Sequence, residues 1–294
     1  MQYIGELSAL AAAMAWAICA VITERTTQQI KANDLNLFVK LAGLLLISLI
    51  IPFTGGSLIP LGVTPAAWFW LILSGVIGFA VGDSFLFQAY QLIGAKVTLM
   101  IFSLAPIITA FFGWIIFGEA LTLYVFLGMA LVLFGLFLVV MEGGGGKIRL
   151  RFSGKGILVA IAAAVGQALG VILSKQGMGA IDAMTTTQIR LIGGVAAMLV
   201  MYLKARSQPD WNVFRDQKLA AVTLFNSFLG TVVGVTLSMV AIANTLAAVA
   251  STLMAVTPVM VLPISFLFLK QKMDWREVAG ALLSVLGIAV LFIL

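Results

Sequence analysis

Charged residues are scarce in this sequence, and histidine is absent. Of 294 residues, 10% are charged and 62% are hydrophobic, and the mean hydropathy is +1.16. A soluble domain carries roughly 25% charged residues, so most of the surface must face lipid. Without histidine, neither a histidine proton relay nor a histidine metal site is available. Cys19 is the single cysteine, which excludes an intrachain disulfide.

The few charges also limit the classes of partner. Seventeen Lys and Arg against eleven Asp and Glu give +6, which in a chain this apolar indicates basic loops beside a membrane rather than nucleic-acid binding. No cluster of acids suits a metal. The run Gly143–Gly146 lacks the Lys-Ser/Thr that follows a phosphate-binding loop, which disfavours an ATP-driven pump. We therefore expect no metal, no cofactor and no nucleic-acid partner.

Long apolar runs fill the rest of the chain. Ten of them approach or exceed the ~20 residues that a membrane-spanning helix needs. The first has Glu6 before it and no basic flank, so it is not a convincing signal peptide. The ten predicted spans are Leu7–Thr23, Leu35–Phe53, Ala66–Tyr90, Val97–Phe117, Leu121–Met141, Gly156–Ser174, Met184–Leu203, Leu219–Ala243, Leu246–Leu269 and Val278–Leu294.

An internal repeat organises these spans. Shifting the sequence by 152 residues aligns small residues and prolines that control helix contact and helix shape. The aligned pairs are Gly78 with Gly230, Gly82 with Gly234, Ala89 with Ala241, Ala95 with Ala247, Pro106 with Pro258, Gly128 with Gly280 and Gly135 with Gly287. We expect a first repeat over residues 1–142, a Gly-rich basic linker over 143–155 and a second repeat over 156–294. Five helices per repeat make the two repeats inverted in the membrane, an architecture typical of secondary transporters.

Several short motifs then point to a family. They are Trp16 in an Ala-rich first span, Gly78–Ala95, Ser103-Leu104-Ala105-Pro106, Phe117-Gly118-Glu119 with Gly128 and Gly135, and Thr257-Pro258 with Gly280. In order and spacing they resemble the drug/metabolite transporter superfamily, ten-helix EamA-domain type, over nearly the whole chain. The resemblance implies an all-α membrane protein with a 5+5 inverted repeat around a central cavity, and movement of small metabolites, often by export. Lys270-Gln271 departs from the Gly-Glu pattern of the first repeat, which leaves Glu119 without a symmetric partner.

Basic residues indicate an orientation in a plasma or inner membrane. Fourteen of the seventeen Lys and Arg lie in loops after odd-numbered spans, and Lys175 alone lies on the other side. The positive-inside rule puts the odd-numbered loops in the cytoplasm and both termini outside. Ten-helix relatives usually have both termini inside, so this expectation departs from the resemblance.

Asp83 is the acid that stands out within a span. An acid in lipid is costly and marks a pathway or coupling site by default, so Asp83 is a candidate for proton coupling or for contact with a cationic substrate group. Lys40 is predicted at the same depth, and a structural Lys40–Asp83 pair is an equal alternative. Arg190 is placed toward the opposite face, where Glu119 is the nearest acid. Lys40 and Arg190 either snorkel or hold an anionic substrate group. Glu119 is expected to order the turn between spans four and five.

Other polar residues and prolines complete the candidate site. Trp16 and Gln167 occupy equivalent points of the first and sixth spans and suit a cavity wall. Gln88 and Asn226 are further cavity candidates, with interhelical hydrogen bonding as the alternative. The candidate hinges are Pro106 and Pro258, with static kinks as the alternative.

Three functions stay open. The first is a secondary transporter of small metabolites, with amino acids or related compounds exported by alternating access and protons coupled through Asp83. The second is an uncoupled facilitator or exchanger, which follows if Lys40 locks Asp83. The third is an intramembrane lipid-modifying enzyme, which the lack of a nucleophile–base pair disfavours. The expected partners are a metabolite and the lipid bilayer, with a monomer sufficient.

Overall fold

The fold is described from a computed structural model of the chain that covers residues 3–54, 58–60, 62–141, 154–261 and 275–292. Over these residues all regular structure is helical. Seven helices or continuous helix runs are long and apolar enough to cross a membrane, and three shorter apolar helices complete a set of ten. The predicted all-α membrane fold is confirmed.

The helices follow the predicted spans closely. In chain order they are α1 (Ile4–Thr26), α2 (Ala32–Ile50), α3 (Pro65–Gly75), α4 (Asp83–Phe102), α5 (Ala105–Phe117), α6 (Leu123–Met141), α7 (Gly154–Met178), α8 (Ala183–Lys204), α9 (Gln217–Asn226), α10 (Thr236–Asn244), α11 (Ala247–Met254) and α13 (Trp275–Leu291). The third span runs from α3 into α4, and the chain turns into the fourth span at Gly94, where φ is +76°. Such a backbone is easily adopted only without a Cβ. The eighth span runs continuously from α9 to α10.

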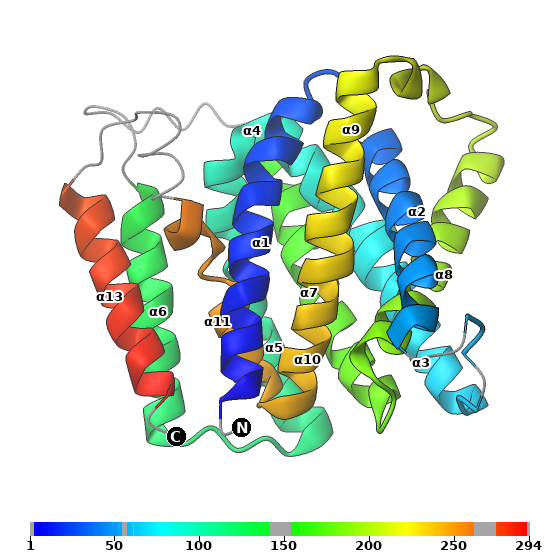
Figure 1. Cartoon of the computed structure of the whole chain (residues 1–294). Helices are drawn as coiled ribbons and strands as arrows, with labels where there is room; N and C mark the ends of the chain where they lie inside the picture. Colours follow the sequence, from blue (N-terminus) through cyan, green and yellow to red (C-terminus); the bar gives the residue numbers. More distant parts are fainter. Residues whose placement is uncertain (1–2, 55–57, 61, 142–153, 262–274, 293–294) are drawn as a thin grey trace.

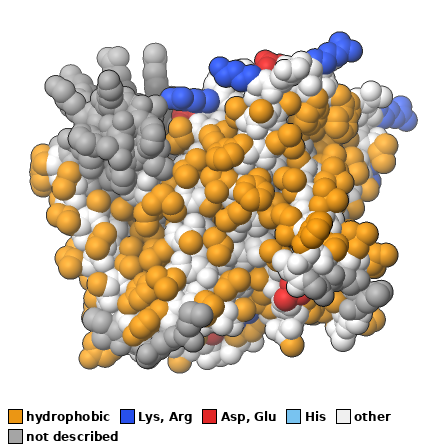
Figure 2. Space-filling model, in the orientation of Figure 1, with side chains coloured by type: hydrophobic (Ala, Val, Ile, Leu, Met, Phe, Trp, Pro, Cys, Tyr) orange, Lys and Arg blue, Asp and Glu red, His pale blue; other side chains and the backbone are white. Residues whose placement is uncertain are grey.

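Alternation of helix direction makes the two halves inverted. In Figure 1 the chain rises through α1 and returns through α2, and both ends of the chain lie at the same edge of the bundle. α6 closes the first half and α13 the second, and these two helices pack side by side. Figure 2 shows hydrophobic side chains over the flank of the bundle, while Lys and Arg gather at the edge opposite the termini. The 5+5 inverted repeat is therefore confirmed.

Glycines bring the two halves into close contact. Gly82 and Gly78 in the third span face Gly166 and Gly170 of α7, so close that a Cβ at Gly166 would lie 2.7 Å from the Gly82 Cα. Their repeat partners, in the eighth span, pack against α1: Gly230 meets Cys19 and Gly234 meets Trp16. Each half thus uses the same glycine pair to contact the first helix of the other half, which accounts for their repetition in the sequence.

Two departures from the α-helix recur in both halves. The third span contains a π-helical segment at Val76–Gly82, and the eighth contains one at Ser227–Val235, around the repeated glycines. We expected plain α-helix in both places. The fourth span breaks at Ser103 and Leu104, just before Pro106. The ninth breaks at the equivalent residues before Pro258. The predicted proline interruptions are present, whereas hinge motion at them stays a prediction.

Some sequence predictions fall on the undescribed residues. The glycine run at 143–146, most of the linker at 143–155, and the Lys270-Gln271 departure lie outside the described residues. So do Pro263 and Asp274. The helix of the fifth span begins with a side-chain cap, because the Thr122 hydroxyl accepts the Val125 N–H at 3.3 Å.

Candidate functional site

A cavity of about 120 Å³ lies between the two halves. On this measure it has roughly ten times the space that one water molecule needs. The lining comes from eight of the ten spans and is spread around the middle of the bundle, from Thr23 and Leu99 on one side to Met239 and Ser251 on the other. Most of the lining is apolar or aromatic, with hydroxyl and amide groups distributed among those side chains. The cavity therefore combines an apolar wall with a few polar contacts, as small-molecule sites commonly do.

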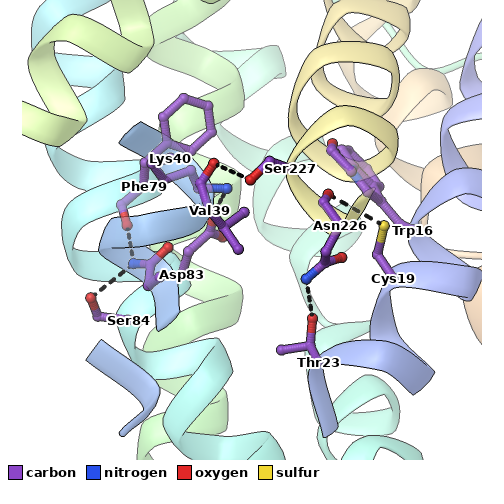
Figure 3. A network of polar contacts seen from close by, with 12 residues as sticks. Trp16, Cys19, Thr23, Val39, Lys40, Phe79, Asp83, Ser84, Asn226 and Ser227 are labelled. Atoms are coloured by element: carbon purple, nitrogen blue, oxygen red, sulfur yellow. Dashed lines mark hydrogen bonds and ion pairs between the residues drawn. The ribbon is translucent and has the colours of Figure 1, made fainter. Parts of the chain in front are cut away.

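Three charged side chains lie in this wall. Lys40 of α2 and Asp83 of α4 form an ion pair with 2.7 Å between Nζ and Oδ2, which confirms the predicted pairing. Figure 3 shows the two side chains meeting beside Phe79. The Lys40 ammonium lies 4.7 Å from the centre of the Phe79 ring, and the Arg190 guanidinium lies 4.5 Å from the same centre. The residues that line the cavity thus carry two positive charges and one negative charge.

Arg190 is fixed by uncharged neighbours. It belongs to the second turn of α8 and is only 3% exposed. Its Nε–H donates to the Ser74 hydroxyl at 2.9 Å, and Nη1 contacts the Met239 sulfur at 3.3 Å. Ser74 is itself held by the Ser174 hydroxyl at 2.8 Å. We predicted that Arg190 lies toward the opposite face near Glu119, which is wrong, because Arg190 and Lys40 approach the same ring.

Glu119 instead joins the two halves at the even-numbered loops. Its carboxylate pairs with Lys175 of α7 at 2.5 Å and accepts the backbone N–H of Ala247, at the start of α11. Lys175 also donates to the Thr245 carbonyl at 3.2 Å. We expected Glu119 to order the turn between spans four and five, but its carboxylate binds the second half. The cause is the single cation on this side of the membrane, which the fold places beside it.

A second polar network connects α1 with the eighth span. The Trp16 Nε1–H donates to the Gly230 carbonyl at 3.0 Å, and the Asn226 amide donates to the Thr23 hydroxyl at 3.0 Å. Figure 3 places Trp16, Cys19 and Thr23 along one face of α1, opposite Asn226. These bonds satisfy polar groups inside lipid and hold one wall of the cavity in place.

Six of the seven predicted cavity residues line the cavity. They are Trp16, Lys40, Asp83, Gln167, Arg190 and Asn226, and the two hinge candidates Pro106 and Pro258 line it as well. Gln88 is not a lining residue. It donates to the Asn33 side chain at 3.0 Å near the helix ends. Five residues after Asp83, a helical position lies about 140° away around the axis, so Gln88 cannot share the face of Asp83.

Several lining residues were absent from the prediction. Phe87 and Tyr90 follow Asp83 at i+4 and i+7, and Cys19 and Thr23 follow Trp16 at i+3 and i+7. Helical spacing from the two predicted residues would have found all four. Phe79 precedes Asp83 by four residues and lies in the π-helical segment, which ordinary helical spacing does not describe.

Two inverted five-helix repeats with a charged cavity between them are typical of secondary transporters among multi-pass membrane proteins. The EamA-like transporter family model matches residues 3–141 and 154–293, so the chain belongs to the EamA-like transporter family. The membership confirms the family resemblance drawn from the sequence.

Two individual proteins resemble this chain. The uncharacterized transporter YvbV of Bacillus subtilis (strain 168) is 25% identical over 185 residues, which are 62% of this chain and 58% of that protein. The chain thus matches less than two thirds of this relative's length. A protein of known crystal structure superposes with a TM-score of 0.78 over 99% of this chain and 97% of its own, at 15% identity. That structure supports the fold alone.

Proposed function

We propose that this chain is a secondary transporter that exports small metabolites, amino acids or related compounds, by alternating access. The single observation that carries the proposal is the cavity between two inverted halves. At the even-numbered loops the Glu119–Lys175 pair and the Ala247 N–H join the halves. A cavity between two inverted halves that are joined at one end is what one state of an alternating-access cycle requires.

Energy coupling depends on Asp83. A proton that binds Asp83 competes with the Lys40 ammonium for the same carboxylate, so proton binding would release Lys40 and change the cavity wall. This exchange is the proposed route for proton coupling. The 2.7 Å contact equally favours the second candidate, an uncoupled facilitator or exchanger in which the pair stays closed throughout the cycle. An intramembrane enzyme is the least favoured function, because the family is one of transporters.

The proposed location is the plasma or inner membrane, with the odd-numbered loops in the cytoplasm. The support is the collection of Lys and Arg at one edge of the bundle (Figure 2). In this orientation the Glu119–Lys175 pair joins the halves at the outer end of the bundle, and the proposed exporter takes up its cargo from the opposite, cytoplasmic end. The proposed functional unit is a monomer, since all the spans that line the cavity come from one chain.

The test is transport by purified protein in liposomes. The vesicles are offered a mixed pool of amino acids and related metabolites, with and without a proton gradient, and their contents are read by mass spectrometry. Gradient-driven accumulation of one class, abolished by Asp83→Asn, is the expected result for the coupled transporter. Equilibration that ignores both the gradient and the substitution identifies the facilitator. A chain that moves nothing from the pool overturns the proposed substrate class.

A further inference from the structure

We propose that Arg190 is the anion-binding residue of the cavity, and that it receives the carboxylate of a small organic molecule with an apolar body. The inference rests on the proposed transport function and goes further, because it assigns the chemical group by which the substrate is held. It is carried by the placement of three charges around one cavity and by the unused donors of a buried guanidinium.

Arg190 forms no ion pair of its own within the described residues, although the charge of Asp83 acts on it across the cavity. Unpaired charges inside a membrane protein are costly, and such residues usually pair with an acid. Among the described residues that line the cavity, Asp83 is the single acid, and Lys40 already occupies it at 2.7 Å. Glu119 is taken by Lys175. The cavity wall therefore holds one positive charge in excess, and a ligand with one negative group neutralises it.

The guanidinium also has donors to offer. It carries five N–H groups in a rigid fork. The Nε–H donates to the Ser74 hydroxyl, and the acceptor near Nη1 is the Met239 sulfur, which is a weak hydrogen-bond acceptor. Nη2 has no hydrogen-bond partner within the described part of the chain, and it lies beside Gly78, where a Cβ would come to 3.4 Å. Two neighbouring N–H groups that are free to donate match the two oxygens of a carboxylate.

The surroundings hold this donor pair in place before any ligand arrives. The Ser74–Ser174 hydroxyl pair fixes Nε, and the Phe79 ring lies 4.5 Å from the guanidinium centre. Because the side chain is 3% exposed, few waters compete for its donors. An anion that binds here loses little entropy to reorganisation of the protein, which favours affinity.

The rest of the wall selects the body of the ligand. Trp16, Phe87, Tyr90 and Phe102 contribute aromatic surface to the same cavity. A carboxylate attached to a flat apolar group can satisfy both the guanidinium and this surface. A dianion or a cation fits less well, because the charges in the wall sum to a single positive charge.

The experiment compares two molecules of the same shape and different charge. Benzoate and benzamide are titrated by calorimetry into the full chain in lipid nanodiscs, with no gradient, so that the readout is binding alone. We expect benzoate to bind about tenfold or more tightly than benzamide, since hydrogen bonds to a charged group are worth 1.5 kcal/mol or more. Arg190→Gln should abolish this preference, and Arg190→Lys should retain a fraction of it.

A matched control separates the cavity from the total charge. Arg206, at the end of the helix that carries Arg190, is exposed, so Arg206→Gln should leave the preference unchanged. Equal affinity for benzoate and benzamide, binding of neither, or a preference that survives Arg190→Gln overturns the inference. The comparison of benzoate with benzamide on the unaltered chain tests the inference even if a variant fails to fold. Transport in liposomes without any preference for carboxylates would overturn this inference and leave the proposed function standing.

Discussion

Two ion pairs place carboxylates inside the bundle, and they differ in their further partners. Asp83 lies in the cavity wall against Lys40. Glu119 binds Lys175 and also accepts the Ala247 N–H at 3.0 Å, so one carboxylate touches two elements of the second half. A charge held by several donors is harder to release than one held by a single cation. We infer that the Asp83 pair is the one suited to exchange partners during function.

Removal of Lys175 should show the strength of the second pair. In Lys175→Met the buried Glu119 carboxylate keeps only backbone donation from Ala247. Loss of one partner from a buried pair costs about 3–5 kcal/mol, and because Lys175 is 23% exposed we expect about 2 kcal/mol. The measurement is denaturant unfolding in detergent. The double variant with Glu119→Gln as well should recover part of the loss, and equal effects of the single and double variants would contradict the role of the pair.

Pairing of charges could be predicted for one pair and not for the other. Lys40 and Asp83 lie on consecutive spans of one repeat, so their depths can be counted along the chain. Glu119 and Lys175 belong to different halves, and their contact depends on how the halves interlock. Arg190 was misplaced for the same reason: its hydroxyl partner, Ser74, lies in the other half. Contacts between residues of one repeat can be predicted from the sequence. Contacts between residues of different repeats depend on how the two halves pack, which the sequence does not show.

At the scale of elements, glycine contacts set how closely α7 approaches the third span. A Cβ at Gly166 would lie 2.7 Å from the Cα of Gly82, and backbone cannot move aside as a side-chain tip can. Overpacking of this kind costs about 1–3 kcal/mol. Gly166→Ala should therefore lower stability by that amount and should slow transport, because both elements border the cavity.

Gly154→Ala is the matched control, since it makes the same change at the start of the same helix. A Cβ there meets nothing within 4 Å. Alanine also favours the helix over glycine, so the control should keep or slightly raise stability. Thermal unfolding of the two variants in one detergent is the comparison, and a loss of equal size in both would show that close helix contact is not the cause.

Element type and order could be read from the sequence, but the π-helical segments could not. Apolar runs and loop positions gave spans that match the helices to within a few residues, because lipid forces backbone groups to bond within helices. Val76–Gly82 and Ser227–Val235 have the apolar composition of any buried helix. Both segments contain the glycines that contact the other half, a contact that apolar composition alone does not indicate.

Over the whole molecule, the inverted repeat is symmetric in backbone and asymmetric in charge. The glycine contacts, the π-helical segments and the breaks before Pro106 and Pro258 occur in both halves. Asp83, by contrast, corresponds to Val235 in the second half. A symmetric scaffold allows two equivalent states that open to opposite sides, whereas the charges in the cavity wall are divided unequally: Lys40 and Asp83 belong to the first half and Arg190 to the second.

Cysteine labelling tests the orientation of this asymmetry in the membrane. Cys19 lines the cavity, so the background variant is Cys19→Ser. Ser207 is exposed in an odd-numbered loop and Ala180 is exposed in an even-numbered one, so Ser207→Cys and Ala180→Cys report on opposite sides. Fourteen Lys and Arg in the odd-numbered loops should keep those loops in the cytoplasm. A membrane-impermeant maleimide should then label intact cells at position 180 and reach position 207 only after lysis. The reverse pattern would place both termini, and the Glu119–Lys175 pair that joins the halves, at the cytoplasmic end.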